Sequence, residues 1–177
     1  MAVFGFSQSS KASYKKEIYK SKKSKTLSKK KYTITEPKET DLTLYADEAN
    51  YIAKQISYAA QENIGAKYKS GGTNQNGFDC SGLVFSTFLL YDIILPRTSK
   101  EMSDYGNTVE SNNAKLGDLI FFSTNNSGRV NHVGIITEIL DNDIKFIHSS
   151  VHKGVIISSL NENYYKKSFI KINRILD

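Results

Sequence analysis

The hydrophobic pattern of this chain changes its period near residue 117, and that change constrains the fold more than any other feature. Before it, apolar residues recur at helical spacing over residues 41–65 and 79–92, which predicts two helices. Thr98 with Glu101 three residues later is a capping-box pattern and predicts the start of a short helix. After it, apolar residues fall in short strand-like runs that predict five strands, at residues 119–123, 132–139, 144–150, 154–158 and 169–176.

The segments between the predicted strands are mostly too short to hold crossover helices. An antiparallel sheet follows, because tight turns can join only antiparallel neighbours. Helices first and strands second indicate an α+β fold, with the helices packed on one face of a five- to six-stranded antiparallel sheet. The chain has 177 residues, enough for one domain with a substantial core, and we place that domain at residues 41–177.

Residues 1–40 differ in composition from the rest of the chain. Ten lysines and one acid, Glu17, lie between Lys11 and Lys31, a local charge of +9; the whole chain carries +6, so the remainder carries −3. Lys, Ser and Thr dominate this stretch, which predicts a disordered basic tail. Such a tail is either a solvated tether or a patch for an anionic membrane or wall polymer. No base-reading motif accompanies it, so nucleic acid is not an expected partner.

The cysteine count and the hydropathy exclude several classes of protein. A single cysteine, Cys80, excludes an internal disulfide framework and a four-cysteine zinc site. No run of about 18 apolar residues exists, so no transmembrane segment is expected. The stretch MAVFGF is too short for the apolar region of a signal peptide. An unsecreted protein and one whose signal has been removed are both compatible with this beginning.

Cys80 lies between Asp79 and Ser81, after a glycine-rich stretch and at the start of the second predicted helix. Asp79 suits the N-cap of that helix, which places Cys80 in its first turn. The free N–H groups and the dipole of a helix N-terminus favour an anion, so we expect a lowered thiol pKa and a nucleophilic thiolate. The alternative is that Cys80 is a small core residue, the commoner role of a lone cysteine in an apolar helix.

A nucleophilic thiol needs a base and a group that orients the base. Two histidines, His132 and His148, lie in predicted strands. His132 can serve Cys80 as the base if helix and sheet pack face to face, and His148 can orient it. Side chains alternate along a strand, so the two histidines share a face only if paired residue numbers have an even sum. With a two-residue turn at residues 141–142, the numbers of paired residues add up to 283, which is odd. The two histidines can therefore share a face only if the loop is longer or a strand contains a β-bulge.

A zinc site is the competing interpretation of the histidines. His148 and His152 have the spacing of a ligand pair on a helix, but they straddle the end of a predicted strand. We therefore expect neither a metal nor another cofactor.

Five motifs follow one another along the chain: GFDCSGLV at 77–84, LPRTS at 95–99, LGDLIFF at 116–122, NHVGI at 131–135 and FIHSS at 146–150. Together they resemble the NlpC-type family of cell-wall cysteine peptidases, over roughly residues 48–175. The resemblance implies a papain-like α+β fold with the nucleophile at a helix N-terminus. It favours the catalytic role of the cysteine over the packing role.

The resemblance also implies roles for individual residues. Cys80 matches the nucleophile, His132 the base and His148 the polar residue that orients the base. Tyr68 matches a tyrosine whose hydroxyl helps the nucleophile's backbone N–H to stabilise the oxyanion. The positions that match substrate contacts are Asp79, suited to an amine, its neighbour Ser81, and Arg97 with Ser99, which border the pocket for a D-glutamyl carboxylate.

Four positions depart from the family pattern. The family often has an aromatic residue in place of Ser70, Asp in place of Thr98, Pro in place of Lys115, and His or a bulky residue in place of Asn131. Ser70 and Thr98 lie near the specificity pocket, so the exact stem peptide stays open.

The resemblance implies a peptidoglycan hydrolase that cleaves stem peptides, commonly at the bond between γ-D-glutamate and diaminopimelate. We expect a monomer in the cell envelope, whether periplasmic, lipid-anchored or secreted. Three alternatives stay open. One is an acyltransferase or amidase on the same fold, which the order of Cys80 before His132 disfavours. The others are a catalytically inactive wall-binding module and an exported toxin with the same chemistry.

Overall fold

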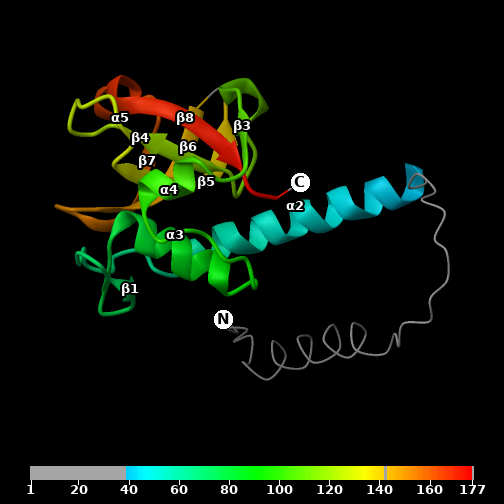
Figure 1. The fold of residues 1–177 in the computed structure, drawn as a ribbon, viewed down its shortest axis with the longest axis horizontal. Coiled ribbons are helices and arrows are strands. Elements are labelled where there is room, and N and C mark those ends of the chain that lie inside the picture. The colour runs from blue at the N-terminus through cyan, green and yellow to red at the C-terminus, as the bar shows by residue number, and fades with distance from the viewer. Residues whose placement is uncertain (1–38, 142, 177) are drawn as a thin grey trace, which may run out of the picture. The chain divides into compact units, whose positions relative to one another are not determined.

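Two helices, α2 (Glu39–Gln61) and α3 (Cys80–Leu89), lie against one face of a β-sheet (Figure 1). The computed structural model describes residues 39–141 and 143–176. Both helices match their predicted ranges closely, and α2 buries Ala53, Ile56 and Ala60 as expected of an amphipathic helix. The predicted tail lies outside the described residues, except that residues 39 and 40 belong to α2.

Within the described residues, the sheet has six strands, each antiparallel to its neighbours, in the order β3-β8-β4-β5-β6-β7. The strands are β3 (Asn107–Val109), β4 (Leu119–Phe122), β5 (His132–Leu140), β6 (Asp143–Ser150), β7 (Gly154–Ser159) and β8 (Phe169–Arg174). Five of them are the predicted strands, so the α+β fold with an antiparallel sheet is confirmed. The sequence does not predict β3, because three residues carry too short a pattern.

Shorter elements connect these layers. Helix α4 (Ser99–Ser103) begins after Thr98, whose side chain accepts a hydrogen bond from the backbone N–H of Glu101 at 3.2 Å, and the predicted capping box is confirmed. A small hairpin, β1 (Thr73–Asn74) and β2 (Gly77–Phe78), precedes α3, and a 3₁₀ turn, η1 (Ser111–Asn113), follows β3. Helix α5 (Asn163–Ser168) lies between β7 and β8, where the sequence predicts a loop, because its six residues show no helical apolar stripe.

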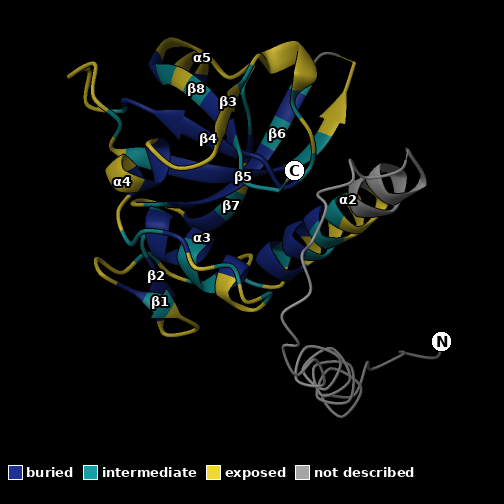
Figure 2. Ribbon diagram, turned by 45° about the vertical axis from the view of Figure 1, so that its right-hand side comes forward, coloured by how far each residue is buried: buried dark blue, intermediate teal, exposed yellow. Residues whose placement is uncertain are grey.

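Each face of the sheet has its own apolar core (Figure 2). Phe121 and Val133 belong to the core on the face that α2 and α3 cover. Phe122 and Phe146 belong to the core on the opposite face, where their rings pack around Tyr165 of α5. We call these the α3 face and the α5 face. Neighbouring residues of the central strands therefore point into different cores.

The hairpin of β5 and β6 changes its register along its length. Near its turn, Glu138 pairs with Lys145. Their residue numbers add up to 283, the odd sum that a two-residue turn produces. A β-bulge at Thr137 then shifts the pairing, so that Ile136 pairs with Phe146, an even sum of 282. The even register that the histidines require is thus produced by the bulge and not by the turn.

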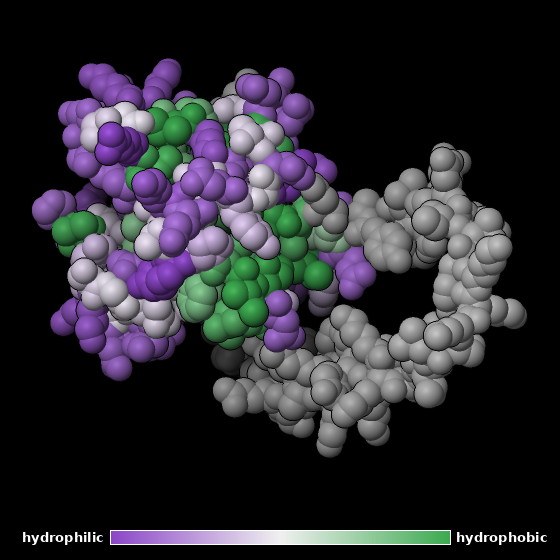
Figure 3. Space-filling view, viewed as in Figure 1, coloured by the Kyte–Doolittle hydropathy of each residue, from purple (hydrophilic) through white to green (hydrophobic). Residues whose placement is uncertain are grey.

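The outer surface of the helical layer is apolar near the end of α3. Leu89, Leu90 and Ile94 are exposed there, and Figure 3 shows apolar side chains gathered over α3 and α2. Among the described helices, none is long and apolar enough to cross a bilayer.

Candidate active site

Cys80 is the first residue of α3, and Asp79 is the N-cap of that helix, as the sequence predicts. The Asp79 backbone is extended, and its side-chain Oδ1 accepts a hydrogen bond from the backbone N–H of Gly82 at 2.6 Å. A Cβ at Gly82 would lie 1.9 Å from the carbonyl oxygen of Gly72, so the start of the helix and the glycine-rich loop touch backbone to backbone. This contact places the half-buried Cys80 beside the loop that carries Tyr68.

The thiol of Cys80 favours its neutral form. Burial raises the pKa of this thiol, and the Asp79 carboxylate raises it further. The backbone N–H groups of Val133, Ser81 and Cys80 itself lower the pKa, but they do not outweigh these two effects. The lowered thiol pKa predicted from the helix N-terminus is therefore wrong. The N–H groups act as expected, but desolvation and a neighbouring negative charge dominate.

His132 is the first residue of β5, and the backbone N–H of the next residue, Val133, faces the Cys80 sulfur. His132 pairs with Phe122 of β4 and packs against its ring, so its side chain lies on the α5 face. The helix and the histidine thus do not meet face to face across one interface, as the sequence-based prediction assumes. Instead, the start of α3 lies at the end of β5 where His132 stands.

The two strand histidines form a hydrogen-bonded pair. The Nε2 of His132 lies 2.9 Å from the Nδ1 of His148, and the two rings are inclined at 83°. Gly134 lies between them on the same face, where a Cβ would come within 2.7 Å of the Phe146 ring and 3.4 Å of the His148 Cβ. The register condition on which the orienting role of His148 depends is therefore met.

Both histidines are neutral at physiological pH. Burial lowers the pKa of His132 to about 4. Burial and the charge of His132 lower the pKa of His148 to about 3. A neutral imidazole has one N–H donor and one bare nitrogen. Because the Nε2 of His132 is engaged with His148, Nδ1 is the His132 nitrogen left for a thiol proton.

Two hydroxyl groups lie next to the other nitrogen of His148, and neither was predicted from the sequence. The Nε2 of His148 lies 3.2 Å from the Oγ of Ser158 on β7 and 3.1 Å from the hydroxyl of Tyr165 on α5. Ser158 pairs with Phe146, so it shares the face of His148, and the register of the β6–β7 hairpin could have identified it. Tyr165 lies in the helix predicted as a loop, and no signal in the sequence points to it.

Tyr68 lies close enough to Cys80 and Asp79 for their charges to affect its hydroxyl. It forms an isolated bridge with Phe78, the residue before Asp79. Burial raises the pKa of the Tyr68 hydroxyl, and the charge of Cys80 when its thiol is ionised and the Asp79 carboxylate raise it further. The hydroxyl therefore keeps its proton and can donate a hydrogen bond, as the oxyanion role requires.

Three of the four predicted substrate-binding residues form one polar cluster. Arg97 donates to both carboxylate oxygens of Asp79, at 3.0 and 2.7 Å, and to the Oγ of Ser81 at 2.9 Å. Burial raises the pKa of Asp79, but hydrogen bonds from Arg97 and from the backbone N–H of Gly82 outweigh it, and the pKa is lowered. The fourth residue, Ser99, is buried at the first position of α4 and is not part of these contacts.

The remaining candidate groups lie outside this site. His152 is exposed in the turn between β6 and β7. In the part of the chain that the structure describes, no three His, Cys, Asp or Glu side chains gather to hold a metal ion.

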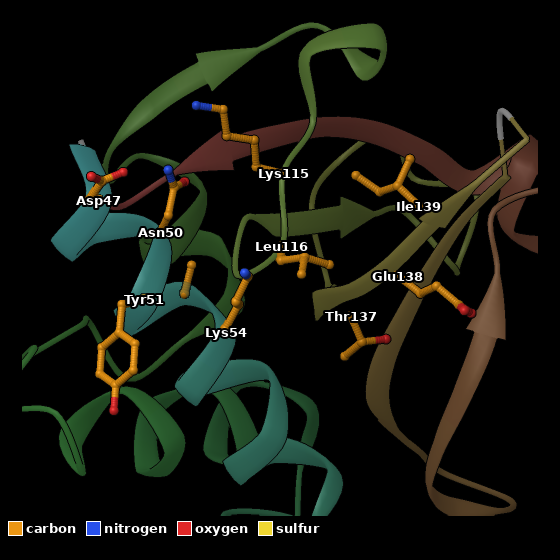
Figure 4. A pocket seen from close by; sticks show the side chains of 10 residues that line it. Asp47, Asn50, Tyr51, Lys54, Lys115, Leu116, Thr137, Glu138 and Ile139 are labelled. Carbon is orange, nitrogen blue, oxygen red and sulfur yellow. The ribbon is translucent and has the colours of Figure 1, made fainter. Parts of the chain in front are cut away.

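A cavity of about 680 Å³ lies between α2, the loop before β4 and the far end of β5 (Figure 4). Lys54, Lys115 and Glu138 are among the residues that line it. None of the predicted site residues lines this cavity. The candidate active site is therefore defined by its cluster of side chains and not by this hollow.

Several curated proteins are similar to this chain. The murein DD-endopeptidase MepS/murein LD-carboxypeptidase of Escherichia coli is 41% identical over 113 residues, which are 63% of this chain and 57% of that protein. A probable endopeptidase of Haemophilus influenzae is 38% identical over 121 residues, 68% of this chain and 73% of that protein. The gamma-DL-glutamyl hydrolase of Bacillus subtilis is 37% identical over 117 residues, 65% of this chain and 27% of that protein. The chain thus spans only part of each relative.

Solved structures show the same fold. An NlpC/P60 family protein of Bacillus cereus has a TM-score of 0.64 and 31% identity, and the match covers 71% of this chain and 40% of that one. The NlpC/p60 domain of the peptidoglycan hydrolase SagA has a TM-score of 0.57 and 24% identity, covering 69% of this chain and 97% of that one. The expected papain-like α+β fold is therefore confirmed. The model of the NlpC/P60 family matches residues 65–174, a range that contains Tyr68, Cys80, His132 and His148. This chain belongs to the NlpC/P60 family.

Proposed function

We propose that this protein is a peptidoglycan hydrolase, a cysteine peptidase that cleaves stem peptides. The observation that carries the proposal is the position of Cys80 at the start of α3, beside a strand end where His132 is hydrogen-bonded to the buried His148. Relatives named as a murein endopeptidase and a gamma-DL-glutamyl hydrolase support the class of substrate.

In the proposed reaction, the Nδ1 of His132 takes the thiol proton while the Cys80 sulfur attacks the carbonyl carbon. The carbonyl opens to an oxyanion, which the Cys80 backbone N–H and the Tyr68 hydroxyl stabilise. The carbonyl then re-forms as the C–N bond breaks, and His132 gives its proton to the leaving amine, which leaves a thioester. Water attacks the thioester with His132 as the base, and the proton returns to the sulfur as the carboxylic acid departs.

The resting site determines the pH dependence of this reaction. The raised pKa of Cys80 and the His132 pKa of about 4 leave both groups uncharged at neutral pH. The thiol proton therefore moves when the substrate is attacked, and His132 must be unprotonated to receive it. We expect kcat/KM to be lost as the pH falls through about 4.

The proposed scissile bond joins γ-D-glutamate to diaminopimelate. The cluster of Asp79, Ser81 and Arg97 supports this choice, because it provides a carboxylate and a guanidinium next to Cys80 for a substrate with carboxylates and an amine. The Arg97 side chain is 36% exposed, so it can exchange part of its contact with Asp79 for a substrate carboxylate. The relative named as a DD-endopeptidase makes the D,D cross-link the competing bond.

Mass spectrometry of purified muropeptides after digestion tests the activity and the bond together. The wild-type chain should release fragments cut between D-glutamate and diaminopimelate, and Cys80→Ala should release none. His152→Ala, which changes a histidine outside the site, is the matched control and should cleave normally. Fragments cut at the D,D cross-link would replace the proposed bond. Cleavage by Cys80→Ala, or binding to sacculi without any released fragment, would overturn the hydrolase.

We further propose that the protein acts as a monomer in the cell envelope, where its substrate lies. The ten lysines between Lys11 and Lys31 support contact with an anionic membrane or wall polymer. Deletion of residues 1–38 should reduce retention on purified cell walls at low salt, because such contacts are screened by salt. The deletion should leave cleavage of soluble muropeptides unchanged.

A further inference from the structure

We propose that Tyr165 and Ser158 are positioning residues that accept the Nε2–H of His148 and thereby set the tautomers of both His148 and His132. The inference rests on the function proposed for Cys80 and His132, because it concerns the nitrogen that receives the thiol proton.

Within the described residues, the ring nitrogens of His148 contact His132, Ser158 and Tyr165. Its side chain is 1% exposed, so solvent does not replace the contacts that it makes. The Nδ1 faces the Nε2 of His132 at 2.9 Å, and the Nε2 faces Ser158 at 3.2 Å and Tyr165 at 3.1 Å. Ser158 and Tyr165 are themselves buried. The two hydroxyls therefore terminate a chain of hydrogen bonds that begins at His132.

The proton between the two histidines can lie on either nitrogen, and its position decides whether His132 is a base. If the Nε2 of His132 carries it, the Nδ1 is bare and can take the thiol proton. His148 then accepts at Nδ1 and must donate at Nε2. If the Nδ1 of His148 carries the proton instead, His148 accepts at Nε2, and His132 is left with a proton on Nδ1 and no lone pair for the thiol.

The two hydroxyls at the far end of the chain decide whether the productive state has its acceptor. A buried N–H without an acceptor costs free energy, so the productive state needs an oxygen that accepts the Nε2–H of His148. The Ser158 and Tyr165 oxygens lie 3.2 and 3.1 Å from this Nε2, and burial raises the pKa of Tyr165, so its hydroxyl stays protonated. A hydroxyl oxygen has lone pairs besides its proton, so each of the two oxygens can accept the Nε2–H.

The same direction of hydrogen bonding, from His132 through His148 to the two hydroxyls, is needed during the reaction. When His132 takes the thiol proton, it becomes an imidazolium that donates from Nε2 to the Nδ1 of His148. That donation requires the His148 tautomer whose Nε2–H is held by Ser158 and Tyr165. The hydroxyls therefore support the charged intermediate as well as the resting base.

The hydroxyl of Tyr165 can be tested separately from its ring. The ring packs on Phe122 and Phe146, at centroid distances of 5.3 and 5.0 Å, and Tyr165→Phe retains these contacts. Tyr164 is the matched control, because it is the preceding residue on α5 and is 56% exposed. Ser158→Ala together with Tyr165→Phe removes both oxygens.

Nitrogen-15 NMR of the full chain with labelled histidine reads the tautomers without any substrate. In the wild-type chain, both His132 and His148 should be protonated at Nε2 and bare at Nδ1. In the double variant, the Nε2–H of His148 loses its acceptors, so both rings should shift toward protonated Nδ1. Unchanged tautomers in the double variant, or protonated Nδ1 in the wild type, would overturn the proposal.

Kinetics give the second readout. Tyr165→Phe should lower kcat on muropeptides about tenfold with KM unchanged, and the double variant about a hundredfold. The alkylation rate of Cys80 by iodoacetamide at pH 7 should fall in parallel, whereas Tyr164→Phe should change neither rate. Wild-type alkylation and kcat in the double variant would contradict the inference. If no muropeptide is cleaved by any variant, the proposed function fails, but the tautomers and the alkylation rate still decide this proposal.

Discussion

The polar groups on the two sides of Cys80 differ in their ionisation: one pair is charged and the other is neutral. On one side, Asp79 and Arg97 are ionised, paired at 2.7 Å, and keep contact with solvent through the partly exposed guanidinium. On the other side, His132 and His148 are hydrogen-bonded, buried and neutral. Solvent contact and a partner of opposite charge preserve an ionised group, whereas burial next to neutral partners removes its charge.

The groups on both sides of Cys80 affect the protonation of its thiol. Burial raises the pKa of Cys80, and the Asp79 carboxylate raises it further. On the histidine side, a lowered pKa keeps His132 ready as a base but does not supply a positive charge that would stabilise a thiolate. This site therefore begins its reaction from a neutral thiol and a neutral imidazole.

The largest loss of activity should follow from a change in the neutral histidine pair. His132→Gln removes the base but keeps a polar side chain, so kcat/KM on muropeptides should fall by about a thousandfold. Alkylation of Cys80 at pH 7 should also slow, because the neutral thiol loses its proton acceptor. His152→Gln is the control and should behave as the wild type. A variant at His132 that still cleaves at the wild-type rate would show that the buried pair is not catalytic.

The next effect is on stability at acid pH. The pKa of each buried histidine is lower in the folded chain than the ordinary value of 6.5, at about 4 for His132 and about 3 for His148. The unfolded chain therefore binds protons first, so the stabilisation is complete above pH 6.5 and is lost as the pH falls toward 4 and then 3. Each histidine should contribute a slope of about 1.4 kcal/mol per pH unit in this window.

Urea denaturation of the wild type and of His148→Gln between pH 7 and pH 4 measures this slope. The variant should lose stability less steeply than the wild type as the pH falls. An equal slope in both proteins would mean that His148 is not held neutral.

A change in the ionised pair of Asp79 and Arg97 should lower the pKa of the Cys80 thiol. Asp79→Asn keeps a side chain that can cap α3 but removes the carboxylate that raises the pKa of Cys80. It also leaves the guanidinium of Arg97 without its ion-pair partner. The thiol pKa should fall, as measured by the pH profile of alkylation. Asp104→Asn, at an exposed acid, should leave the profile unchanged, and a higher thiol pKa in Asp79→Asn would contradict the comparison.

The smallest effect concerns the support of the charged side. Thr98 follows Arg97 and caps α4 through the backbone N–H of Glu101. Thr98→Ala should cost about 1 kcal/mol of unfolding free energy, the usual value of an N-cap. Thermal unfolding measures this loss, and alkylation of Cys80 should be nearly unchanged. A strong loss of thiol reactivity would show that α4 positions the nucleophile more directly than the contacts of Arg97 indicate.

Local patterns in the sequence were sufficient for much of the fold and for part of the site. Helical spacing identified α2 and α3, strand-like runs identified five strands, and the position of Asp79 identified the start of α3. These features depend on residues close to one another in the chain, which is why they can be recognised there. Strand β3 and helix α5 were missed because each is too short to show a period.

Local sequence patterns predicted that Cys80 lies in the first turn of a helix and that His132 and His148 both lie in strands. They also set the condition under which the histidines share a face. The folded chain meets this condition because a β-bulge at Thr137 corrects the odd register of a two-residue turn. A bulge leaves one residue of the strand unpaired in the ladder, and no local pattern in this sequence marks where it falls.

Tertiary structure also decided the charge of the site. The helix N-terminus predicts a lowered thiol pKa from local geometry alone, but the pKa depends on how much water the fold removes and on which charges it brings near. The same holds for Ser158 and Tyr165, which reach His148 from β7 and α5. Burial and long-range neighbours are properties of the packed chain, so the residues of this site could be named from the sequence while their protonation could not.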